Sequence, residues 1–177
     1  MGLSRILPVW RIALVVFIVA SILWLGGTHA RMLLANDLLK TGTLEMAEYI
    51  PPEAEREVYH LMSVTAVMVV PAYAAAVISS IVFLALSPYR PKRNGWLMMS
   101  AILFYLFVPV EAYTMTLDAR MVYQEFFTTA DNHVFRELFL ARVGALGGAP
   151  VIAMLSYYTI IILAVVQPMK RREEALS

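Results

Sequence analysis

The sequence predicts an all-α fold, an integral membrane four-helix bundle with both termini in the cytoplasm. Three observations support this prediction. Of the 177 residues, 60% are hydrophobic and 15% are charged, whereas soluble domains have roughly 45–50% and 25%. Four apolar stretches reach the length of about 20 residues that a helix needs to cross a bilayer. Basic residues gather beside these stretches on one side, which the positive-inside rule assigns to the cytoplasm.

The whole chain, residues 1–177, is expected to form one transmembrane domain. The spans are placed at about 9–28, 61–87, 96–117 and 143–168, and the connections at about 29–60 and 118–142 are expected to face outward. The short connection between the second and third spans favours antiparallel neighbours. The first apolar run lacks an A-x-A-like cleavage site, so we interpret it as a retained helix rather than a signal peptide.

The basic residues that set the orientation are Arg5, Arg11, the turn at 88–95 and the tail at 170–172. Arginines also occur in the two long outward connections, where acidic residues dilute them. The positive-inside rule counts the short basic segments close to the spans, so these arginines do not set the orientation. The expected location is a bacterial cytoplasmic (inner) membrane.

The helices are expected to continue past the membrane on the outer side. A helix from Pro52 to Leu86 would be about 50 Å long at about 1.5 Å per residue, and the hydrocarbon core is about 30 Å thick. The first helix continues beyond its span and is expected to stop at Thr41-Gly42. These extensions predict a small helical cap on the outer side.

The third span contains a carboxylate, Glu111, within otherwise apolar sequence. An ionisable residue inside a span is costly and by default suggests a functional site. Asp118 follows seven residues later and therefore lies on the same helix face. The structural alternative is that Glu111 pairs with Arg31, Arg120 or Arg142 and fixes the registry between helices.

Histidines and carboxylates are expected to gather at the outer mouth of the bundle. His29 and His60, together with Glu111, form a set that suits zinc, iron or copper, and the two histidines suit a b-type haem. Glu57 precedes His60 with the Glu-x-x-His spacing of di-iron carboxylate bundles, although those bundles need two such motifs. The alternative is that both histidines are ordinary residues of the membrane interface.

Three glycines, Gly144, Gly147 and Gly148, open the fourth span. Small residues favour close helix contact, either within this bundle or with another subunit. The same glycines would also tolerate a broken helix start over a cavity.

The sequence leaves two functional hypotheses open. A chain without cysteine has no disulfides, thiolate metal sites or iron–sulfur clusters, and its net charge of +1 does not favour nucleic acid as a partner. The first hypothesis is a non-catalytic subunit of a larger membrane complex, in contact with lipid and with other membrane subunits or further copies of itself. The alternative is a redox membrane protein that depends on a metal ion or haem at the outer mouth, and whether the chain is an enzyme stays open.

One short segment resembles part of known membrane proteins. Trp24-Leu25-Gly26-Gly27, at the outer end of the first span, resembles small bacterial four-helix membrane families, some of which are haem- or copper-associated. The resemblance covers four residues and transfers no site residues.

Overall fold

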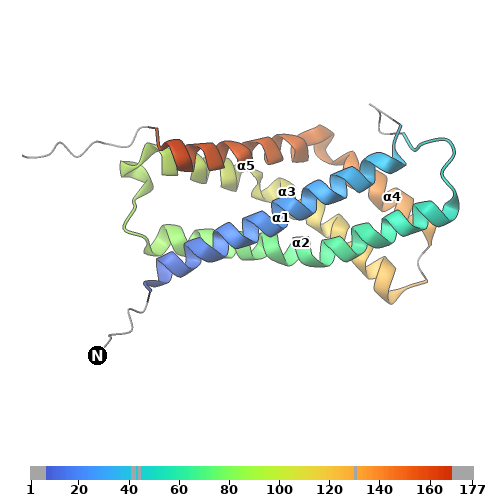
Figure 1. Cartoon of the computed structure of the whole chain (residues 1–177), viewed down its shortest axis with the longest axis horizontal. Coiled ribbons are helices and arrows are strands. Elements are labelled where there is room, and N and C mark those ends of the chain that lie inside the picture. The colour runs from blue at the N-terminus through green and yellow to red at the C-terminus, as the bar shows by residue number, and fades with distance from the viewer. Residues whose placement is uncertain (1–6, 41–42, 44, 130, 169–177) are drawn as a thin grey trace, which may run out of the picture.

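The computed structural model describes residues 7–40, 43, 45–129 and 131–168, and the fold of these residues is all-helical. The α-helices are α1 (Val9–Leu38), α2 (Pro52–Leu86), α3 (Gly95–Phe127), α4 (Asn132–Val143) and α5 (Ala149–Val166) (Figure 1). Short 3₁₀ turns at Pro91–Arg93 and Ala145–Gly148 join α2 to α3 and α4 to α5. Four stretches, Val9–Leu38, Pro52–Leu86, Gly95–Phe127 and Asn132–Val166, are long and apolar enough to cross a membrane. The predicted all-α fold with four long apolar helices is therefore confirmed.

The two ends of the bundle differ in composition. We name them the turn end, where α1 begins, α5 ends and the α2–α3 turn lies, and the α4 end, where α4 lies (Figure 1). The turn end holds Arg11, Arg90, Lys92 and Arg93, so the positive-inside rule places it in the cytoplasm, and this orientation stays a prediction. Arg5, the tail at 170–172 and the expected helix stop at Thr41-Gly42 lie outside the described residues.

Local sequence explains where α2 begins. Pro52 occupies the first turn, where a missing backbone N–H costs little, and Glu53 and Glu55 follow in the same turn, next to the positive end of the helix dipole. The helix then runs through Pro71 to Leu86. Its 35 residues span about 52 Å, which is longer than a bilayer core of about 30 Å.

Two hydrophobic clusters hold the helices together. The central cluster takes Trp24 from α1, Tyr73 from α2, Phe104 from α3 and Tyr157 from α5. The rings of Trp24 and Tyr157 pack edge to face with centroids 4.6 Å apart, and the hydroxyls of Tyr73 and Tyr157 lie 2.9 Å apart. The second cluster lies at the α4 end and contains Ala35, Leu38, Tyr59, Met62, Met121, Phe135 and Phe139.

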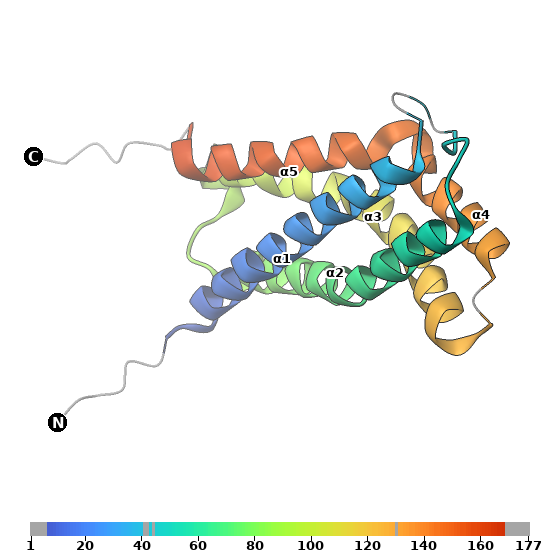
Figure 2. The ribbon, with the colours of Figure 1, turned by 45° about the vertical axis from the view of Figure 1, so that its right-hand side comes forward.

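The helices pack as two main pairs, α1 with α2 and α3 with α5. Figure 2 shows that α1 crosses the bundle, because it starts beside α2 at the turn end and approaches the start of α5 near the α4 end. Gly27 lies where α1 packs on α2, and a Cβ there would come closer than 3.0 Å to the side chain of Val69. The crossing leaves the two pairs further apart at the turn end (Figures 1 and 2).

Candidate functional site

A buried ion-pair cluster centred on Asp118 lies between the two hydrophobic clusters. Asp118 is 1% exposed. Arg31 makes a two-pronged contact with it, in which Nη1 donates to Oδ2 at 2.8 Å and Nη2 donates to Oδ1. The Nε of Arg142 also donates to Oδ1, at 3.1 Å. One carboxylate therefore ties α1, α3 and α4 together.

Glu111 lies two helical turns before Asp118 and shares a small cavity with the same arginines. The cavity has a volume of about 130 Å³, and Arg31, Arg142, Trp24 and Met154 are among its lining residues. Glu111 is 5% exposed, and the charges of Arg142, Asp118 and Arg31 act on it.

The structural alternative to a functional role for Glu111 is that it pairs with Arg31, Arg120 or Arg142. Arg31 and Arg142 both form ion pairs with Asp118, and Arg120 is exposed. Two arginines and two carboxylates still share one region, so the cluster is electrically balanced when both acids are ionised. A balanced, buried cluster that joins three helices is suited to fixing their registry.

The structure gives each predicted histidine a different partner. His29 contacts the backbone oxygen of Leu25 through Nδ1 and the hydroxyl of Tyr158 through Nε2, both at 2.6 Å. His60 contacts Glu125, with Nδ1 2.8 Å from Oε1. That carboxylate, rather than the exposed Glu57, is the neighbour of His60.

Among the residues that the structure describes, no three His, Asp or Glu side chains lie close enough together to hold a metal ion. The four predicted metal ligands, His29, His60, Glu57 and Glu111, therefore do not come together at one site in the described part of the chain. Binding of a metal ion or of a b-type haem stays a prediction.

The glycines that open the predicted fourth span form a turn. The predicted span starts at about residue 143, whereas α4 ends at Val143 and α5 begins at Ala149. Gly147 and Gly148 have φ values of 60° and 89°, a backbone conformation that favours glycine. Val143, Pro150 and Val151 line the cavity of Glu111, so the alternative of a broken helix start over a cavity is what the structure shows.

Gly147 and Gly148 have open space beside them. A Cβ at Gly147 or Gly148 would meet nothing within 4 Å. Within this chain they serve to turn the backbone, and their contact with another subunit stays a prediction.

Sequence reasoning missed a second ionic contact at the α4 end. Glu55 is 3% exposed and accepts hydrogen bonds from Arg136 Nε at 2.9 Å and Nη2 at 2.7 Å. It also accepts one from the hydroxyl of Tyr59 at 2.7 Å. The i, i+4 spacing of Glu55 and Tyr59 on α2 was a usable signal, but the arginine comes from α4, 81 residues away.

No protein-family model, no curated protein and no solved structure matches this chain. Its function is therefore argued from the geometry of the molecule.

Proposed function

We propose that this chain is a non-catalytic subunit of a larger membrane complex and that α5 contacts the partner. The observation that carries the proposal is the sparse burial of α5. Of its 18 residues, Ala153 and Tyr157 are buried, whereas α2 buries eleven of its 35. The packing of α5 comes mainly from α3, so one flank of this span is held and the other is uncovered.

The uncovered flank of α5 is largely aliphatic and includes two small polar residues, Ser156 and Thr159. Helices in a bilayer associate through close packing and small polar residues, because lipid tails are as apolar as the side chains themselves. Ser156 is half-buried and Thr159 is exposed, and their hydroxyls donate to backbone oxygens of α5 at 2.9 and 3.0 Å. They therefore present no unpaired polar atom to a neighbour. The exposed apolar residues around them are Val151, Ile152, Leu155, Ile161, Ile162, Val165 and Val166.

The charge arrangement supports the same proposal. Asp118 and Glu55 each form ion pairs with arginines of this chain, so neither carboxylate needs a cation from another subunit. A partner helix would then meet an apolar face with small polar residues. We infer that the contact is made by packing rather than by charge pairing.

The test is a purification of the tagged full-length chain from its own membrane in mild detergent. Wild type is compared with Leu155→Trp on α5 and with Leu106→Trp on α3, two leucines that are 57% and 63% exposed. We expect stoichiometric partner bands with wild type and with Leu106→Trp, and their loss with Leu155→Trp. All three chains, once separated from any partner, should keep the same melting temperature, since an added indole at a position that is exposed in this chain leaves its core unchanged.

Other results would redirect the proposal. Light scattering that shows a defined dimer sensitive to Leu155→Trp would identify the partner as a second copy of this chain. A monomer without partner bands would refute the proposal. A Soret band or near-stoichiometric metal, lost in the double variant His29→Ala/His60→Ala, would favour the redox alternative.

A further inference from the structure

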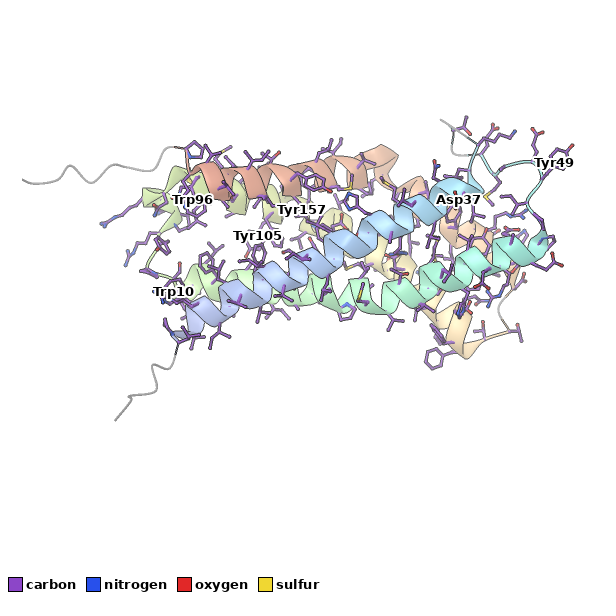
Figure 3. All side chains as sticks on the ribbon, in the orientation of Figure 1. Trp10, Asp37, Tyr49, Trp96, Tyr105 and Tyr157 are labelled. Carbon is purple, nitrogen blue, oxygen red and sulfur yellow. The ribbon has the colours of Figure 1, made fainter. Side chains whose placement is uncertain are left out.

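A larger cavity lies at the turn end, between the α1–α2 pair and the α3–α5 pair. Its volume is about 660 Å³, within the range of about 300–1,000 Å³ that is typical of small-molecule sites. Figure 3 shows Trp10 and Trp96 on opposite helix pairs near the turn end, with Tyr105 further inside. Phe17 and Phe104, whose rings pack edge to face with centroids 5.5 Å apart, line the cavity next to the central cluster.

Two residues that line this cavity have hydrogen-bonding groups without a partner in the described part of the chain. Trp96 Nε1 and Ser100 Oγ are both buried and, among the described residues, have no hydrogen-bond partner. Both residues line the cavity, and Ser100 is 7% exposed. They are four residues apart on α3 and therefore lie on one helix face. A buried donor without an acceptor is costly, so this wall of the cavity indicates a bound acceptor.

Arg11, Ser80 and Tyr105 are among the other polar residues that line the cavity, and Arg11 indicates the charge of that acceptor. Arg11 lines the cavity, and its guanidinium lies 5.1 Å from the ring centroid of Trp10. Deeper in the cavity, Ser80 and Tyr105 satisfy each other with their hydroxyls 2.9 Å apart. The indole of Trp96 can only donate a hydrogen bond, and Arg11 is a permanent cation. The occupant is therefore expected to have an anionic, accepting headgroup and an apolar body.

We propose that this cavity binds one anionic phospholipid from the membrane leaflet at the turn end. The phosphate accepts hydrogen bonds from Arg11 and Trp96. Ser100 lies about 6 Å deeper, at about 1.5 Å per residue, where it donates to an ester carbonyl of the glycerol backbone. The segments of the acyl chains next to the glycerol backbone contact the apolar wall of the cavity. A neutral quinone has no use for the cation at Arg11, which is why we favour the lipid.

This inference needs only the membrane location of the chain. It does not depend on the proposed contact between α5 and a partner subunit, and a failure of the proposed complex would leave it intact. The bound lipid is distinguished from the surrounding lipid by its stoichiometry and by its headgroup preference.

Native mass spectrometry of the purified full-length chain tests the proposal. The chain is exchanged into detergent containing equal amounts of phosphatidylglycerol, phosphatidylcholine and a short-chain quinone. We expect one phosphatidylglycerol per chain to be retained in preference to the other two. The variants Arg11→Gln and Trp96→Phe should reduce its retention, the first by about tenfold through loss of a charge-assisted contact, and Ser100→Ala by about threefold.

A matched control separates the cavity from the general charge of the turn end. Arg93 is an exposed cation at the same end that does not line the cavity, so Arg93→Gln should retain lipid like wild type. Ala101→Trp fills the cavity and should abolish retention without changing the melting temperature. Equal retention of both lipids, equal effects of Arg11→Gln and Arg93→Gln, or retention of no lipid would overturn the proposal. Retention of the quinone instead would overturn the headgroup assignment.

Discussion

Replacing Gly27 by alanine tests how closely α1 must approach α2. The added Cβ would come closer than 3.0 Å to Val69 Cγ2, lie 3.3 Å from Met68 Cε and 3.8 Å from Thr65 Cγ2. Met68 can move its flexible end. Val69 is 2% exposed and, as a β-branched residue in a helix, has one strongly preferred rotamer. The overlap must therefore be relieved by moving one helix away from the other.

The expected cost follows from two opposing effects. Overpacking of a tight contact destabilises by about 1–3 kcal/mol, and alanine in place of glycine stabilises a helix by about 1 kcal/mol. Gly26 is the matched control, because a Cβ there would meet nothing within 4 Å and gains the same helix propensity. The difference between Gly27→Ala and Gly26→Ala isolates the clash, and we expect it to be about 1–3 kcal/mol in favour of the Gly26 variant.

Thermal unfolding in mild detergent, followed by the fluorescence of the chain's tryptophans, measures this difference. A double variant, Gly27→Ala/Val69→Ala, adds a second check, because removing the two methyl groups of Val69 makes room for the new Cβ. It should be no less stable than Val69→Ala alone. If Gly27→Ala and Gly26→Ala melt at the same temperature, the close approach of α1 and α2 at this point is refuted.

Three further predictions concern the polar contacts. Asp118→Ala leaves two guanidinium groups without their carboxylate and should lower the free energy of unfolding by about 3–5 kcal/mol. As a control, replacing the exposed Asp37 by alanine should change it by less than about 0.5 kcal/mol. Similar melting temperatures of the two variants would contradict this prediction. Tyr73→Phe strands the hydroxyl of Tyr157 in the central cluster and should cost about 1–3 kcal/mol, and Tyr73→Phe/Tyr157→Phe should recover most of that stability. Glu55→Gln weakens the contact between α2 and α4, so amide exchange over residues 132–143 should accelerate, and unchanged exchange would show that apolar packing alone holds α4.

The fold was predictable because the spans depend on apolar length, which is read directly from sequence. The start of α2 was also predictable, since Pro52 and the acids after it are a local signal. The helices were expected to continue past the membrane on the outer side, but the residue at which α3 ends was not predicted. The predicted span ends at about residue 117, whereas the helix continues to Phe127, because hydropathy reports where the apolar segment ends and not where the helix ends.

The partners of the buried charges were less predictable for a different reason. Glu111 and Asp118 share one face of α3, and spacing alone does not say which of them Arg31 and Arg142 reach. That choice depends on where α1 crosses α3 and where α4 docks, and both are tertiary facts. Glu125, which is 65 residues from His60, has no local signal at all.

The comparison of the two cavities changes where a ligand is expected. An ionisable residue in a span draws attention to Glu111, yet its cavity is small, and the arginines that line it already bind Asp118. Among the described residues, no carboxylate lines the larger cavity, and the hydropathy of the sequence does not reveal this cavity. Two of its lining residues, one helical turn apart, nevertheless have buried hydrogen-bonding groups without a partner among the described residues, and a cation also lines it. Since a buried hydrogen-bonding group without a partner is costly and a ligand can supply that partner, the turn end is the better place to search for what this protein binds.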